Sequence, residues 1–243
     1  MKPFKLFFLL TLLGSGLWAK SITIAAASDM KYAMNEIVNL YVQRHNDVKI
    51  NPVYGSSGKT FTQISNGAPY DIYYSADIEY PKKLKAMGKA IGDVKPYAIG
   101  QIVLWSNTLS TARGIETLLS PNVKRVAIAN PDHAPYGRAA VAALKYYGIY
   151  DDVKEKLIYG ENISQAAQYV QTKAADIGIL ALSITSSPAL KNTPPTLIPK
   201  LSHPPLLQGY IQVTNNPDAT EFLLFFETKE ANSILKKYGF ILQ

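Results

Sequence analysis

Hydroxyl side chains and free backbone N–H groups occur together at several points where a strand pattern gives way to a helix pattern. The first such point is Ser28, at the end of the apolar run Ile22–Ala27. A hydroxyl and several unpaired backbone N–H groups at one point in space attract an anion. Ser28 could instead be an N-cap whose hydroxyl bonds only to its own helix. Its position alone leaves both roles open.

The second such point follows the next strand pattern and has the sequence Gly55-Ser56-Ser57-Gly58-Lys59-Thr60. A nucleotide-binding P-loop would need a glycine five positions before Gly58, but Val53 stands there. The P-loop interpretation is therefore disfavoured. What remains is a nest of backbone donors, with the hydroxyls of Ser56 and Ser57 at a helix start.

Two further helix starts lie in the second half of the chain. In the loop 130–137, prolines stiffen the backbone and Gly137 allows a ligand to approach it, which would place the N–H groups of Tyr136 and Gly137 at a helix N-terminus. Taken alone, an ordinary rigid loop is the better interpretation. Asn162 is expected to cap the next helix and to leave the N–H of Ile163 available.

Signatures of catalysis are weak. The pattern Gly-x-Ser-x-Gly is absent, because Lys59 occupies the position of the second glycine around Ser57. Asp71 and Asp77 are better explained as strand-end caps than as a catalytic carboxylate pair. The histidines show no metal-ligand spacing: His45, His133 and His203. We therefore expect no catalytic residue, no enzymatic activity and no directly coordinated metal cation.

The elements that must position these sites alternate between strand and helix, which predicts the α/β class with parallel sheets. The first unit is expected to hold strands over 22–27, 48–53 and 71–75, and helices over 30–41, 60–66 and 81–87. Near Gly100 the pattern restarts. The second unit is expected to hold strands over 101–105, 123–129 and 176–182, and helices over 138–147 and 163–172.

The end of the chain is too short to form a domain of its own. A proline-rich connection, 192–205, leads to one strand pattern at 209–214 and two helix patterns at 220–226 and 230–238. The simplest closure returns this tail to the first unit. Two lobes joined by two crossings then form a clamshell, in which strand ends from both lobes face a shared cleft. We expect residues 20–100 plus 206–243 to form lobe I, and residues 101–205 to form lobe II.

Residues 1–19 have the layout of a secretory signal peptide, with Lys2 and Lys5 before an apolar run and Ala19 at the expected cleavage point. The run is too short to span a bilayer. The chain has no cysteine, which excludes lipidation at a cleavage-site Cys, thiol catalysis and thiolate metal sites. The net charge of +7 comes from lysines on expected helix faces rather than from a groove with stacking aromatics. We expect a soluble, monomeric, periplasmic protein with no nucleic-acid partner.

At the level of motifs, the chain resembles the periplasmic molybdate-binding proteins of ABC importers from Ser21 to Phe240. The stretches that carry the resemblance are Ala25–Ser28, Gly67–Asp77, Pro131–Gly137 and Lys237–Phe240. The resemblance implies a two-lobed periplasmic-binding-protein clamshell of type II, in which each lobe is a mixed sheet flanked by helices. It also implies a receptor that binds molybdate or tungstate, needs no cofactor, and delivers its ligand to an ABC transporter permease in the inner membrane.

In that family the oxyanion is held by neutral hydrogen-bond donors. Matching residue by residue, the resemblance implies that Ser28 and Ser57 bind through their hydroxyls, and that Tyr136 and Ile163 bind through their backbone N–H groups. The chain departs from the family at one donor. Many relatives place a tyrosine where Ala181 stands, and either Ser183 or a water molecule could replace its hydroxyl.

Two alternatives remain beside a molybdate receptor. One is a receptor of the same fold for sulfate or phosphate, and phosphate would need an acceptor for its proton, for which Asp29 is the nearby candidate. The other is a secreted hydrolase built around Ser57, for which a catalytic base is missing. Because none of the four implied ligand groups titrates, affinity is expected to be nearly flat from about pH 6 to 9. A steep drop would point to a charged contact, first of all Arg138.

Overall fold

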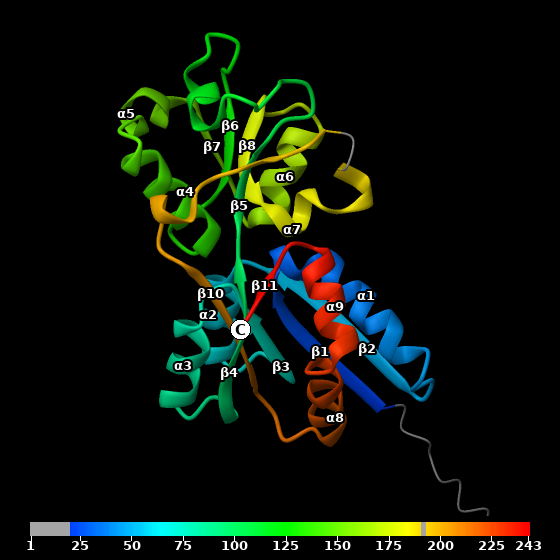
Figure 1. The fold of residues 1–243 in the computed structure, drawn as a ribbon. Helices are drawn as coiled ribbons and strands as arrows, with labels where there is room; N and C mark the ends of the chain where they lie inside the picture. The colour runs from blue at the N-terminus through cyan, green and yellow to red at the C-terminus, as the bar shows by residue number, and fades with distance from the viewer. Residues whose placement is uncertain (1–19, 191–192) are drawn as a thin grey trace, which may run out of the picture.

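The computed structural model describes residues 20–190 and 193–243, which form two lobes stacked one above the other (Figure 1). The expected signal peptide, residues 1–19, lies outside the described residues. Each lobe contains one sheet with helices on its faces, so the chain is of the α/β class. Within the described ranges, none of the helices combines the length and the apolar composition of a membrane span.

The lower lobe in Figure 1 is built on a sheet whose six described strands have the order β11-β4-β10-β3-β1-β2. The strands are β1 (Lys20–Ala27), β2 (Val48–Gly55), β3 (Ile72–Ser75), β4 (Ile91–Gly100), β10 (Leu206–Gln212) and β11 (Ile241–Leu242). The helices are α1 (Lys31–Val42), α2 (Ser57–Ser65), α3 (Glu79–Ala86), α8 (Pro217–Phe226) and α9 (Lys229–Lys237). Strand β1 is parallel to β2 and β3, whereas β10 runs antiparallel between β3 and β4.

The upper lobe is built on a sheet whose five described strands have the order β7-β6-β8-β5-β9. The strands are β5 (Ile102–Trp105), β6 (Val126–Ala129), β7 (Leu157–Gly160), β8 (Ile177–Ala181) and β9 (Thr196–Leu197). The helices are α4 (Pro135–Tyr146), α5 (Tyr150–Val153), α6 (Ile163–Gln171) and α7 (Leu182–Thr185). Strand β6 is parallel to β7 and β8, and β5 is antiparallel to β8.

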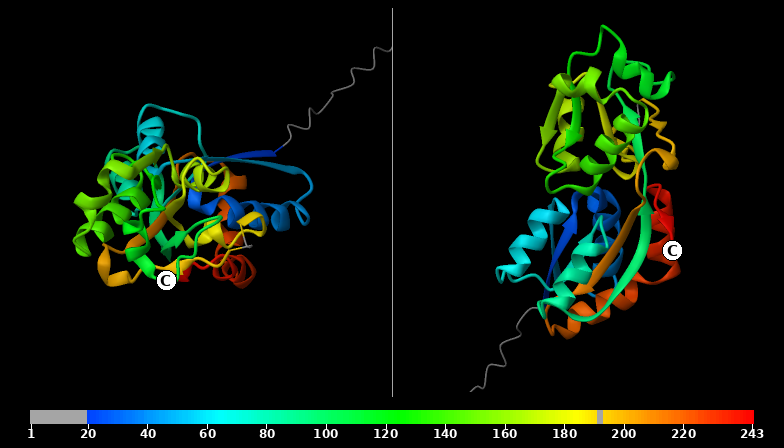
Figure 2. Two further views of the ribbon diagram at one scale, coloured as in Figure 1. Left: turned by 90° about the horizontal axis from the view of Figure 1, so that it is seen from above. Right: turned by 90° about the vertical axis from the view of Figure 1, so that its left-hand side faces the viewer.

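The chain crosses between the lobes at two places, where β4 leads into β5 and where the segment before β10 returns (Figure 2). Gly100 stands at the first crossing. A Cβ added there would lie 2.2 Å from the Tyr136 hydroxyl and 2.7 Å from the Gln208 side chain. Glycine is therefore required at this crossing because side chains from both lobes pack against its backbone.

Both sheets are mixed, as the resemblance implies, and not parallel throughout, as the alternation of strands and helices alone predicts. The alternation does not fix the direction of strands that return from the other lobe, such as β10. The sequence patterns also do not predict β4 or β7. In β4, Gly92 and Pro96 obscure the apolar alternation, and Pro96 sits beside a register shift opposite Gly209.

Two helices begin earlier than their apolar patterns predict. Helix α2 begins at Ser57 rather than Thr60, and α4 begins at Pro135 rather than Arg138. Proline is well suited to the first helical position, where its missing N–H has no intrahelical partner to lose. Because the helices begin at these positions, Ser57 and Tyr136 lie in the first turn of α2 and α4. Backbone N–H groups in a first turn have no partner within the helix.

The core of the lower lobe contains a cluster of aromatic rings around Phe226, which is 2% exposed. Its ring centroid lies 4.7 Å from that of Tyr74, 5.7 Å from that of Tyr97 and 5.6 Å from that of Tyr210. These rings join α8 to strands β3, β4 and β10. The carboxyl-terminal helices are thereby fixed to the lobe that begins with β1.

We expect Phe226→Ala to lower the free energy of unfolding by about 3–5 kcal/mol, because it leaves a cavity among three packed rings. The change is measured by urea denaturation. Leu224→Ala is the matched control, since Leu224 is on the same helix but 65% exposed, and it should change stability by no more than about 0.5 kcal/mol. Equal losses in the two variants would contradict the packing described here.

Candidate functional site

Ser28, Ser57, Tyr136 and Ile163 line one small cavity between the two lobes. The structure therefore brings together all four residues singled out from the sequence. The volume of the cavity that is open to water is only about 10 Å³. This is space for about one water molecule. A ligand at this place has to be small, and the lobes have to separate to admit it.

Parallel strand pairs place these residues at one edge of each sheet. In the lower lobe Ala27 pairs with Gly55, so the chain leaves β1 and β2 side by side, next to Ser28 and Ser57. In the upper lobe Ala129 pairs with Gly160, and the chain then continues to the starts of α4 and α6. Each lobe thus presents two neighbouring strand ends to the cleft, as expected for ligand sites in α/β proteins.

The two serine hydroxyls accept hydrogen bonds that leave their own protons free. Ser57 is 1% exposed, and its Oγ accepts a bond from the Ala76 N–H at 3.0 Å. The Oγ of Ser28 accepts a bond from the Ser164 N–H of the other lobe at 3.3 Å. The Ser28 hydroxyl therefore does not cap its own helix. The alternative role as an N-cap is thereby excluded. Both hydroxyls retain a proton that can be donated to a ligand.

Two backbone N–H groups complete the cavity from the upper lobe. Asn162 caps α6 as expected, since its Oδ1 accepts a bond from the Gln165 N–H at 3.1 Å. The Gly137 N–H is used within its own turn, with the Ala134 carbonyl at 3.0 Å. The N–H groups of Tyr136 and Ile163 have no hydrogen-bond partner among residues 20–190 and 193–243. Both lie at helix starts, where the helix dipole favours an anion.

The lobes touch one another around the cavity. The Gly58 N–H donates to the His133 carbonyl at 2.9 Å, and His133 Nδ1 lies 2.9 Å from the Ser56 hydroxyl. These contacts hold the start of α2 against the loop before α4. The cleft is therefore closed in this structure.

Charged side chains at the rim form ion pairs across the cleft and do not line the cavity. Arg138 Nη2 lies 2.7 Å from Asp77 Oδ2, and Lys59 pairs with Glu161. Neither cation lines the cavity, so Arg138 is not placed to contact a ligand there. In the part of the chain that the structure describes, no three His, Cys, Asp or Glu side chains gather as a metal site would require.

Asp29 also lines the cavity, where the sequence predicts it only as an acceptor for the proton of phosphate. The residue is 1% exposed. Its Oδ2 accepts bonds from the Tyr136 hydroxyl at 3.0 Å and from Gln208 Nε2 at 2.6 Å. Burial raises the pKa of the Asp29 carboxyl to about 6, while hydrogen bonds from Gln208, Tyr136 and nearby backbone N–H groups lower it. Burial likewise raises the pKa of Tyr136 well above its usual value.

Ser183 does not face the cavity. Its hydroxyl donates to the Asp29 backbone carbonyl at 2.8 Å, and it is absent from the cavity lining. Ser183 is therefore not a substitute for the tyrosine hydroxyl that the resemblance places at position 181. Its role in this structure is to hold the turn that carries Asp29.

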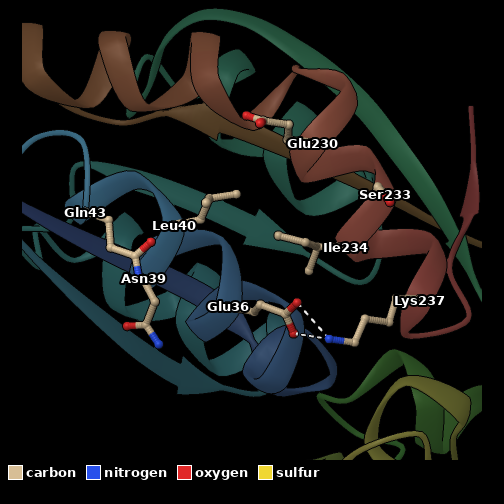
Figure 3. Close-up of a pocket in the computed structure, with 8 residues that line it drawn as sticks. All are labelled: Glu36, Asn39, Leu40, Gln43, Glu230, Ser233, Ile234 and Lys237. Carbon is tan, nitrogen blue, oxygen red and sulfur yellow. Dashed lines mark hydrogen bonds and ion pairs between the residues drawn. The ribbon is translucent and has the colours of Figure 1, made fainter.

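Two larger hollows lie beside this cavity or away from the cleft. A groove of about 480 Å³ between α1 and α9 lies outside the cleft (Figure 3), where Leu40 and Ile234 face each other and Glu36 pairs with Lys237 at 2.8 Å. A second groove of about 480 Å³ runs between the lobes and shares Ser28 with the small cavity. Its other lining includes Lys31, Tyr54 and Gln168.

Comparisons with known proteins agree with this geometry. A family model described as "Bacterial extracellular solute-binding protein" matches residues 22–241. The chain is 31% identical over 229 residues to Molybdate-binding protein ModA of Rhodobacter capsulatus, covering 93% of this chain and 90% of that protein. It is 32% identical over 251 residues to Molybdate-binding protein ModA of Azotobacter vinelandii, covering 99% of each.

Solved structures extend the similarity to the fold. The periplasmic molybdate-binding protein of Azotobacter vinelandii superposes with a TM-score of 0.85 at 28% identity, covering 91% of this chain and 99% of that one. The sulfate-binding protein SubI of Mycobacterium tuberculosis superposes with a TM-score of 0.69 at 16% identity, which is a likeness of fold alone. The two-lobed clamshell implied by the resemblance is confirmed.

The buried carboxyl predicts a pH-dependent cost in stability. The pKa of Asp29 is about 6 in the folded chain against an ordinary 3.8, so the folded state binds more protons between these values and loses stability as pH rises through them. We expect Asp29→Asn to avoid this loss, which amounts to at most about 3 kcal/mol at neutral pH.

Urea unfolding of both proteins between about pH 4 and 7 measures the difference. The stability of Asp29→Asn relative to the natural chain should grow toward neutral pH. Ser183→Ala is the control, because it removes a bond to the Asp29 carbonyl but keeps the carboxyl, and its effect should be similar at each pH. A difference between Asp29→Asn and the natural chain that does not change with pH would refute the assignment.

Proposed function

Because the chain belongs to the bacterial extracellular solute-binding proteins, we propose that it is a receptor that binds molybdate between its lobes and delivers it to an ABC transporter permease. The curated relatives named for molybdate support this ligand. Tungstate is proposed as a second ligand, since its oxyanion has nearly the same size and charge. No cofactor is part of the proposal.

One observation carries the proposal: four neutral donors from four strand-to-helix turns line a single cavity, and its lining among the described residues includes no lysine or arginine. We assign the hydroxyls of Ser28 and Ser57 and the N–H groups of Tyr136 and Ile163 to the oxygens of the anion. A hydrogen bond to a charged group contributes about 1.5–3 kcal/mol. Nanomolar binding needs about −12 kcal/mol net, so several such bonds in a preorganised cleft are required.

We further propose that residues 20–100 plus 206–243 move as one lobe and residues 101–205 as the other. Opening would separate Ser28 from Ser164 and Ser56 from His133, which now touch across the cleft. The anion would enter while these contacts are broken and would be enclosed when they form again. Gly100, at the first crossing, belongs to the part of the chain that bends.

The proposed location is the periplasm, after removal of the signal peptide near Ala19. The cleft contacts described above lie within one chain, so a monomer suffices for binding. Nucleic acid has no place in the proposal, because two cationic side chains at the rim of the cavity are paired with carboxylates: Lys59 with Glu161 and Arg138 with Asp77.

A receptor for sulfate or phosphate is the second candidate. Asp29 favours phosphate in one respect, because an ionised carboxylate at the cavity would accept the proton of a monoprotonated anion. The names of the relatives favour molybdate, and the sulfate-binding neighbour shares only the fold.

We propose no catalytic activity. His133 faces Ser56 rather than Ser57, and its Nε2 is 4.0 Å from Glu161, a carboxylate already paired with Lys59. No histidine contact to Ser57 is found among the described residues, so the hydroxyl in the cavity lacks the adjacent base that a serine nucleophile needs. A turnover assay with acyl and phosphoryl esters should detect no hydrolysis.

Thermal unfolding in the presence of molybdate, tungstate, sulfate and phosphate tests the ligand class, because a ligand raises stability by RT ln(1 + [L]/Kd). Molybdate and tungstate should raise the unfolding temperature at micromolar concentrations, and sulfate and phosphate should require far more. A larger shift with phosphate or sulfate would favour the second candidate.

Substitution of Ser57 tests the cavity itself. We expect Ser57→Ala to weaken molybdate binding by about 1.5–3 kcal/mol, or roughly 10- to 150-fold, measured by titration calorimetry. Ser65→Ala is the matched control, since Ser65 lies at the other end of α2 and bonds to the Phe61 carbonyl. An affinity unchanged by Ser57→Ala would remove Ser57 from the site.

A further inference from the structure

The carboxyl of Asp29 has one satisfied and one unsatisfied oxygen. Oδ2 accepts two hydrogen bonds, from the Tyr136 hydroxyl and from Gln208 Nε2. Oδ1 is fully buried and accepts no hydrogen bond of normal geometry from the described residues, although the backbone N–H groups of Asp29 and Met30 are near enough to the carboxyl to lower its pKa. Asp29 lines the same cavity as Ser28 and Ser57. A buried polar atom without a partner beside a binding cavity calls for a ligand that supplies one.

The partners of Oδ2 determine where a proton on this carboxyl must reside. Gln208 Oε1 accepts a bond from the Tyr97 hydroxyl, which orients the amide so that its Nε2 points to Asp29 and Tyr136. Oδ2 is thus occupied by two donors. A neutral carboxyl keeps both of these bonds when its proton is on Oδ1, where it forms a hydrogen-bond donor without an acceptor among the described residues.

We propose that Asp29 is a further ligand-binding residue, which binds the oxyanion as a neutral carboxylic acid and donates its Oδ1 proton to one oxygen of the anion. This inference rests on the proposed function. Asp29 would supply a donor from the lower lobe. The tyrosine hydroxyl that the resemblance implies at position 181 is missing, because Ala181 stands there. The proton comes from solvent when the anion binds and returns to solvent when the anion leaves.

The surroundings of Asp29 favour the neutral form. The side chains that contact it are uncharged and come from several elements: Tyr136 on α4, Gln208 on β10 and Ser183 on α7. Burial is the largest influence on the pKa of Asp29 and raises it to about 6. An adjacent dianion raises the pKa of a carboxyl further, because two like charges in one site repel.

The charged groups around the cleft do not compensate an ionised Asp29. Lys59 pairs with Glu161, and Arg138 pairs with Asp77. His133 contacts Ser56, and Lys31 is exposed on α1. Ser56, which His133 contacts, lines the cavity. His133 is therefore the side chain to be tested beside Asp29.

Proton-coupled binding changes the pH dependence expected from the four uncharged ligand groups. Affinity should be highest at low pH and should fall as pH rises above the pKa of Asp29 in the free protein, by up to tenfold per pH unit. The fall ends at the higher pKa of the complex. Binding at a pH between these two values takes up about one proton per anion.

Titration calorimetry of molybdate into the chain from Lys20 onward tests this at about pH 6.5, 7.5 and 8.5, in buffers of differing ionisation enthalpy. For the natural chain, Kd should rise at least tenfold over this range, and the buffers should report proton uptake. Asp29→Asn keeps a neutral donor of the same shape. It should bind with a pH-independent Kd, without proton uptake, and more tightly than the natural chain at pH 8.5.

His133→Gln is the control and should keep the pH dependence of the natural chain. The inference is overturned if the natural chain binds molybdate with a flat Kd and no proton uptake, or if His133→Gln loses the pH dependence while Asp29→Asn keeps it. Proton uptake by the natural chain tests the inference even if a variant does not fold. Failure of molybdate, tungstate, sulfate and phosphate to bind at any pH would instead overturn the proposed function itself.

Discussion

An anion enclosed without a cation has to be stabilised by dipoles, and this constraint explains most of the cleft. The dipoles available are hydroxyls and the unpaired N–H groups at helix starts. A single helix supplies only a few such N–H groups. Two lobes, each with paired strand ends, bring enough of them together: Ser28 and Ser57 from one side, Tyr136 and Ile163 from the other. Gly58 allows the lobes to approach here, because a Cβ added to it would lie 2.8 Å from the His133 carbonyl oxygen.

The same constraint explains why charges are kept at the rim. A lysine or arginine in the cavity would bind many anions, whereas neutral donors at fixed positions select by geometry. Arg138 and Lys59 are instead used between the lobes, each paired with a carboxylate of the opposite lobe. The one acid that does reach the cavity, Asp29, is held by Tyr136 and Gln208 and is costly to keep ionised. Such a cost in stability is typical of functional sites.

The positions of the four cavity residues have local signals in the sequence, whereas their roles as ligands are implied only by the resemblance. Ser28, Ser57, Tyr136 and Ile163 each stand at a boundary between a strand and a helix, and such boundaries can be identified from a few neighbouring residues. The arrangement around Asp29 has no local signal, since Gln208 is 179 positions away and Tyr136 comes from the other lobe. The mixed sheets, which the resemblance implies, likewise have no local signal, because β10 pairs with β3 and β4 only after the chain returns from the upper lobe.

The central claim is that the anion lies between the lobes, at the four strand-to-helix turns. Crystals grown with molybdate, with anomalous diffraction recorded at the molybdenum absorption edge, test this directly. The account predicts one strong anomalous peak per chain, with oxygens within hydrogen-bond distance of Ser28, Ser57, Tyr136 and Ile163. A peak only at a surface site, such as the groove between α1 and α9, or no peak in crystals that contain molybdate, would contradict it.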